Sequence, residues 1–142
     1  MKLEVQAERI RKVGYKITIT NLQIDETFTE RKSVDVVELG LAAIEDFVNT
    51  GYDVSVYKDE KSQRRLFISG GIENLRLTFD NSKDCARAVE FLQTACDLLY
   101  TDYVCKWYKA AARRAEQFKV DSVQQINERL QELRKQRGNA PS

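Results

Sequence analysis

Two hydrophobic periodicities follow one another between residues 33 and 80, and their order limits the folds open to the chain. In residues 33–51 apolar side chains recur at steps of three and four, as on one face of a helix: Val34, Val37, Leu41, Ile44 and Val48. Residues 52–57, 64–69 and 74–80 instead alternate apolar and polar side chains, which predicts three strands. A polar tract at 58–63 and the pair Gly70-Gly71 separate these strands and predict tight turns. The pattern therefore indicates an antiparallel meander next to a helix.

The N-terminal residues add a second alternating region. Residues 3–7 and 15–20 read as strands of a hairpin around Gly14, and the alternation slips near Asn21, where the strand ends or bulges. Ser33 is suited to cap the following helix, and Gly51 to end it. The expected fold is α+β: an antiparallel sheet of four to five strands with one packing helix and a C-terminal helical arm.

Helical spacing also dominates the chain from residue 82 onward. The first stretch runs without a break through residue 118, or hinges at Thr101 and Asp102. The pattern restarts at Asp121 and Ser122, and two heptads of apolar residues follow: Val123, Ile126, Leu130 and Leu133. We therefore expect an α+β core domain over 1–103, an amphipathic helical arm over 104–137, which packs as a hairpin or on another chain, and a disordered tail over 138–142.

Composition excludes several classes of protein. The chain has no His, so the usual base or ligand of most hydrolytic and metal mechanisms is missing, and no phosphate-binding glycine motif is present. Three cysteines without C-x-x-C spacing read as buried thiols. No apolar run is long enough for a signal peptide or a membrane span. No internal repeat is apparent. We expect a cytoplasmic protein that is not an enzyme and carries no cofactor.

Charge is unevenly distributed although the net charge is +1. Residues 21–60 hold ten acidic and three basic side chains, whereas residues 104–142 hold nine basic and four acidic ones. The acids of the first helix fall opposite its apolar stripe, and we interpret four of them as an acidic docking face: Asp35, Glu38, Glu45 and Asp46.

Residues 105–118, CKWYKAAARRAEQF, mix aromatic and basic side chains. On a helical wheel Trp107 and Phe118 fall together, while Lys106, Lys109 and Arg113 fall on a different face. Nucleic-acid stacking needs both kinds of side chain on one solvent face. The aromatics are therefore expected to anchor the helix on a neighbour, and the basic stripe is a separate surface.

Two functional hypotheses follow. The first is a self-associating interaction or regulatory protein, a homodimer that binds another protein through the acidic face and the basic arm. Its self-association residues are Trp107, Phe118, Val123, Ile126, Leu130 and Leu133. The alternative is a protein that binds DNA or RNA, with Arg residues and aromatics alternating on one sheet face and basic residues on the arm. Its contact residues are Tyr57, Arg65, Phe67, Arg76, Lys106, Lys109, Arg113, Arg134 and Arg137.

Overall fold

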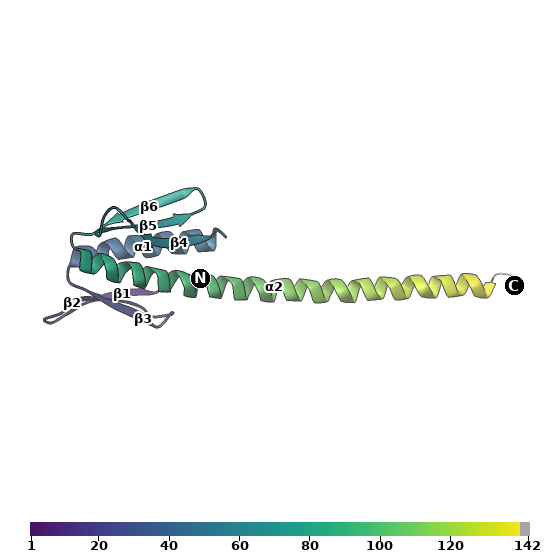
Figure 1. The fold of residues 1–142 in the computed structure, drawn as a ribbon. Coiled ribbons are helices and arrows are strands. Elements are labelled where there is room, and N and C mark those ends of the chain that lie inside the picture. Colours follow the sequence, from purple (N-terminus) through teal and green to yellow (C-terminus); the bar gives the residue numbers. More distant parts are fainter. Residues whose placement is uncertain (140–142) are drawn as a thin grey trace. The chain divides into compact units, whose positions relative to one another are not determined.

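A computed structural model of the protein shows two separate three-stranded antiparallel sheets and two helices (Figure 1). It describes the backbone of residues 1–139, and the side chains of those residues except 104, 105, 107, 118–123 and 136–139. The elements in chain order are β1 (Val5–Ile10), β2 (Gly14–Ile19), β3 (Ile24–Phe28), α1 (Arg31–Asn49), β4 (Val54–Lys58), β5 (Arg65–Gly70), β6 (Glu73–Thr78) and α2 (Ser82–Asn139). Compact packing divides the chain into an N-terminal unit, residues 1–103, and a C-terminal unit, residues 104–142.

The α+β class is confirmed, but the expected single sheet of four to five strands with one packing helix is wrong. The strand orders β1-β2-β3 and β4-β5-β6 form two sheets with no pairing between them. The strand missed by the sequence is β3, which pairs with β2 from Ile19 opposite Ile24 to Tyr15 opposite Phe28. A second helix also packs, because Ala88, Leu92 and Leu99 of α2 are buried.

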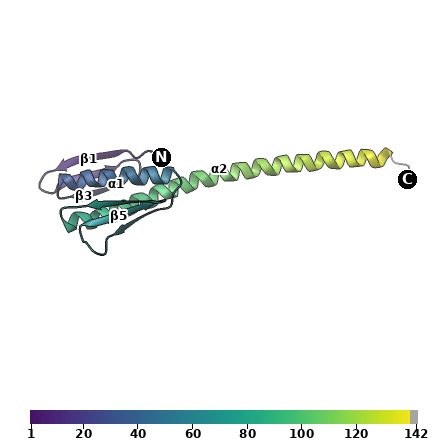
Figure 2. The same ribbon diagram turned by 90° about the horizontal axis from the view of Figure 1, so that it is seen from above.

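Both helices of the N-terminal unit contribute to one hydrophobic core between the two sheets (Figures 1 and 2). α1 contacts strands of both sheets. The first part of α2 also contacts both sheets. Phe91 makes an edge-to-face contact with Phe28 of the first sheet, and the Gln93 amide donates a hydrogen bond to the Val56 carbonyl of the second sheet at 2.9 Å. Each sheet therefore buries only its inner face, and its outer face is left to solvent or to a partner.

The N-terminal unit contains the same βββα arrangement twice. A shift of 51 residues carries β2 onto β5 and the start of α1 onto the start of α2. Buried positions correspond under that shift, and the pairs are Ile17 and Ile68, Phe28 and Phe79, Val34 and Cys85, Val37 and Ala88, Leu41 and Leu92, Ile44 and Ala95, and Val48 and Leu99. The N-terminal unit is thus a structural repeat that the sequence analysis did not detect.

A buried carboxylate joins the N-termini of the two helices. Asp84 accepts hydrogen bonds from the Thr29 amide and hydroxyl at 3.0 Å each, from the Glu30 amide at 3.3 Å and from the Ser33 hydroxyl at 2.6 Å. α1 starts two residues before Ser33, so the expectation that Ser33 caps it is wrong. Asp84 instead fixes the segment that leads into α1, because its carboxylate accepts hydrogen bonds from the amides of Thr29 and Glu30, which precede the first helical residue, Arg31.

In the C-terminal unit the structure shows one helical stretch as far as Asn139. The backbone is helical at Thr101 and Asp102 and again at Asp121 and Ser122, so neither the hinge nor the restart is observed. An antiparallel hairpin within residues 104–139 is therefore excluded. Residues 138 and 139 belong to α2, and the remaining residues of the expected tail, 140–142, lie outside the described part of the chain.

Candidate interaction surfaces

The outer face of the sheet β4-β5-β6 carries two aromatic side chains and an arginine side by side. Tyr57, Phe67 and Arg76 are direct cross-strand partners, because Tyr57 pairs with Phe67 and Phe67 with Arg76. The two rings are stacked, with centroids 5.4 Å apart and planes inclined by 29°. Tyr57 is 42% exposed, Phe67 is half-buried and Arg76 is exposed. We call these three residues the aromatic row.

Arg65 lies on the same outer face as this row but is paired with an acid. Its guanidinium Nε lies 3.4 Å from the Asp59 carboxylate, and its backbone carbonyl accepts a hydrogen bond from the Asp59 amide at 3.0 Å. The Asp59 side chain is only 12% exposed, so this ion pair closes the β4-β5 turn. Arg65 shares the outer face with the row, as the sequence predicted, but its charge is already matched.

The four acids expected on α1 lie along its outward side. Asp35 and Asp46 are exposed, whereas Glu38 and Glu45 are half-buried and line a hollow together with Leu3 and Val5. Asp35 is paired with Arg31 one turn earlier at 3.3 Å. Leu39, which the sequence analysis did not single out, stands among them with 63% of its surface exposed. The acidic face therefore also offers an apolar contact.

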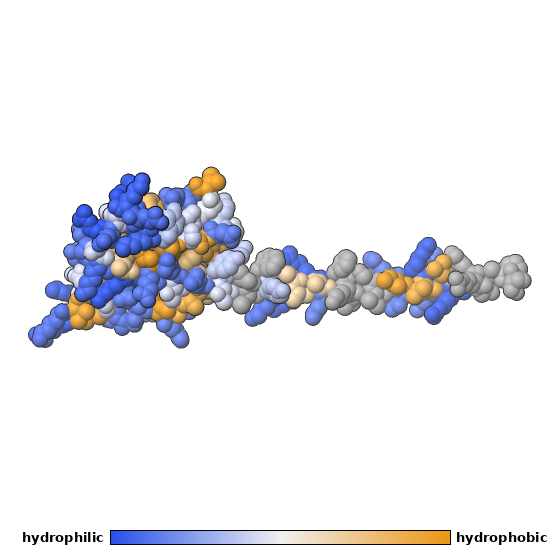
Figure 3. Space-filling view, viewed as in Figure 1, coloured by the Kyte–Doolittle hydropathy of each residue, from blue (hydrophilic) through white to orange (hydrophobic). Residues whose placement is uncertain are grey.

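The C-terminal unit exposes the apolar heptad positions of α2. Ile126, Leu130 and Leu133 are 57%, 45% and 39% exposed, and Figure 3 shows apolar surface along this part of the helix. We call these three residues the seam. The other expected association residues, Trp107, Phe118 and Val123, have side chains outside the described part of the structure.

The basic residues of the arm occupy the same helix. Lys106, Lys109, Arg113 and Arg134 are all exposed, and the Arg137 side chain is among those that are not described. Arg134 lies beside the seam, one residue after Leu133, and Arg129 lies on its other side. The seam is therefore apolar with basic flanks.

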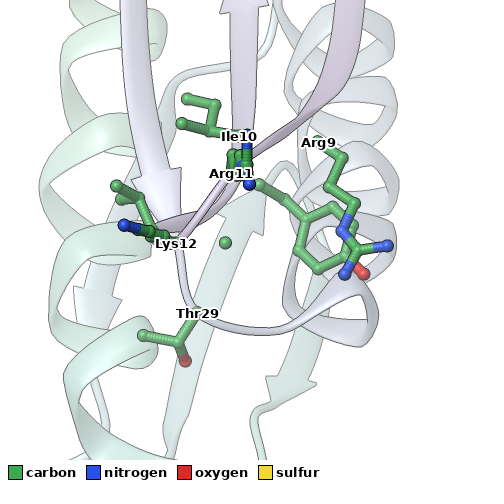
Figure 4. Close-up of a pocket in the computed structure, with 8 residues that line it drawn as sticks. Arg9, Ile10, Arg11, Lys12 and Thr29 are labelled. Atoms are coloured by element: carbon green, nitrogen blue, oxygen red, sulfur yellow. The ribbon is translucent and has the colours of Figure 1, made fainter.

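A hollow at the β1-β2 turn was not expected from the sequence (Figure 4). It has a volume of about 600 Å³, and Arg9, Arg11, Lys12 and Thr29 are among the residues that line it. No ion pair joins its three basic side chains to the described acids. Lys12 has a φ of 71°, a backbone conformation that few non-glycine residues adopt. The only signal in the sequence is the cluster of cations around Gly14.

Two cysteine thiols lie in the core rather than in a site. Burial raises the pKa of Cys85, which nearby Lys58 partly offsets, and burial with the neighbouring Asp97 charge raises the pKa of Cys96 to about 11. Both are therefore protonated and unreactive at neutral pH.

Within the described residues, no group of three or more His, Cys, Asp or Glu side chains is placed to hold a metal ion. No helix in the same part of the chain is both long and apolar enough to cross a bilayer.

Comparison of the chain with models of protein families, with curated proteins and with solved structures found no match.

Proposed function

We propose that the protein is a non-enzymatic interaction protein that associates with a second copy of itself through the seam of α2. The observation that supports this is the exposure of Ile126, Leu130 and Leu133 at successive heptad positions. In the C-terminal unit, all described side chains are exposed except the half-buried Ala111, so this helix has no core of its own there. A partner helix would bury the seam and supply the packing energy that an isolated helix lacks.

The flanks of the seam make this association sensitive to salt. With Ile126 and Leu133 at d positions and Leu130 at a, Arg129 takes a g position and Arg134 the following e position. A parallel in-register pair would bring Arg129 of one copy close to Arg134 of the other. Glu132 lies 3.8 Å from Arg129 on the same helix and offsets part of its charge. The remaining repulsion between the two cations is screened by salt. We therefore expect self-association that strengthens as the ionic strength rises.

The acidic face of α1 is the proposed second binding surface. Asp35, Glu38, Glu45 and Asp46 surround the exposed Leu39, so a basic segment with one or two apolar side chains would fit it. The partner we propose is another protein, and its binding should weaken as salt rises. Self-association through the seam should strengthen with salt and partner binding should weaken, so the two contacts can be told apart by their salt dependence.

Sedimentation velocity over a range of protein concentrations tests the seam. The double variant Ile126→Asp with Leu130→Asp should shift the population to monomer, because it would place four like charges in the dimer interface. The matched control, Gln124→Asp with Gln131→Asp, adds the same charges on the opposite side of the same helix and should leave the dimer intact. If the parent protein is monomeric throughout, or if both variants associate equally, the proposal is wrong.

A further inference from the structure

We propose that the outer face of the sheet β4-β5-β6 binds single-stranded nucleic acid, with a base stacked on the aromatic row. The row presents an aromatic surface that is already assembled. The Tyr57 and Phe67 rings are stacked at 5.4 Å, and the Asn74 amide donates a hydrogen bond to the Tyr57 hydroxyl at 3.4 Å. A ligand that stacks there would meet rings that are already ordered, which lowers the entropic cost of binding.

The structural repeat indicates that these aromatics are not needed to build the sheet. The 51-residue shift that carries β2 onto β5 places Lys16 at the position of Phe67, and the direct cross-strand partners of Lys16 are Glu8 and Thr27. The outer face of β1-β2-β3 is thus polar, and Lys16 forms an ion pair with Asp25 at 3.4 Å. One sheet forms with a polar outer face, so the exposed aromatics of the other are better explained by a ligand than by stability.

The chemistry around the row favours a ligand that combines flat rings with negative charge. Arg76 is exposed at the end of the row, and no ion pair links it to another described residue. The β4-β5 turn next to the row adds the exposed cations Lys61 and Arg64. It also carries two acids: Asp59, which is paired with Arg65, and Glu60, which is exposed. Guanidinium and ammonium groups bind phosphates, and aromatic side chains stack on bases of any sequence.

The ligand must be single-stranded for this geometry to work. A base can lie flat on the aromatic row only if it is free of its neighbours in a duplex. Few phosphates would be neutralised, since only Arg76 and the cations of one turn are near. The expected salt dependence is therefore shallow: about two or three contacts on a single strand give a slope of log K against log salt of roughly −2.

Fluorescence anisotropy with the 142-residue chain tests the proposal. The probes are a labelled oligothymidylate, a labelled oligouridylate and a labelled DNA duplex, each at low and moderate salt. Binding to at least one single strand, with weaker binding to the duplex, is expected. Loss of one stacked base should lower the affinity about ten-fold or more, so Tyr57→Ala combined with Phe67→Ala should show at least that loss.

Two further variants keep the result interpretable. Arg76→Ala removes an exposed cation from the row, and Lys16→Ala removes one from the corresponding face of the other sheet. Arg76→Ala should weaken binding several-fold, and Lys16→Ala should leave it within about two-fold. Circular dichroism shows whether the aromatic double variant folds. If the double variant is unfolded, the affinity of Arg76→Ala is the result that tests the proposal. No binding at low salt would overturn the proposal, as would binding that is equal in the parent, Arg76→Ala and Lys16→Ala proteins; equal binding would direct attention to the arm.

Discussion

At the scale of single residues, Asp84 is the side chain on which most of the described hydrogen bonds between the two βββα halves depend. We expect Asp84→Asn to lower the free energy of unfolding by about 2 kcal/mol, because an amide cannot accept from four donors and would bury an unmatched N–H group. Chemical denaturation monitored by circular dichroism measures the change. Asp80→Asn is the control: Asp80 is an exposed partner of Lys32 at 3.2 Å, and its loss should cost less than about 0.5 kcal/mol.

The difference in stability between the parent protein and Asp84→Asn should depend on pH. Burial alone would raise the pKa of Asp84, but hydrogen bonds from Ser33, Thr29 and Asn81 outweigh it and hold the pKa below its ordinary value of 3.8. A carboxyl whose pKa is lower in the folded state stabilises the fold at pH values above its pKa in the unfolded state. This stabilisation is lost as the pH falls through the pKa of the folded state. The stability gap between the parent and Asp84→Asn should therefore be constant near neutral pH and shrink below pH 3.8. A gap that stays the same in acid would show that the carboxylate charge is not what stabilises the junction.

At the scale of elements, α1 approaches the second sheet closely at Gly40. A Cβ atom there would lie 2.9 Å from Leu77 Cδ1 and 3.2 Å from Ile68 Cδ1. Gly40→Val should therefore overpack the core and cost about 2 kcal/mol, despite the better helix propensity of valine. Ala42→Val, on the exposed side of the same helix, should change stability by no more than about 0.5 kcal/mol. Similar melting temperatures for the two variants would contradict the packing at Gly40.

The elements also show which predictions a sequence can support. Alternation correctly placed Tyr57, Phe67 and Arg76 on one face, because side chains of a strand alternate whatever surrounds them. It could not show that this face stays open, since exposure depends on where the other sheet and the helices pack. β3 was missed because Asp25 and Glu26 weaken the apolar alternation of a short strand. The role of Asp84 at the entry to α1 was missed because its partners lie more than 50 residues away.

At the scale of the whole molecule, the two βββα halves could not be recognised from the sequence, because their residues differ at most corresponding positions. Only a few residues recur at the 51-residue shift, among them Thr27 as Thr78, Phe28 as Phe79 and Lys32 as Lys83. At other corresponding positions both residues are buried but differ in type, as with Ile44 and Ala95. Each half has one exposed helix face and one exposed sheet face, and the two halves differ in what they display. The first half shows acids on its helix, and the second shows aromatics and Arg76 on its sheet.

The core of the described protein lies entirely within the N-terminal unit, so its folding and its self-association should be separable. The last buried apolar residue among those described is Leu99. Ending the chain after Tyr103 should therefore leave the melting temperature within a few degrees of the parent, while sedimentation shows a monomer at every concentration. A truncated chain that is unfolded would mean that residues 104–142 stabilise the core. A folded chain that still dimerises would place the association on the N-terminal unit, where the exposed Leu39 on the acidic face is the first candidate.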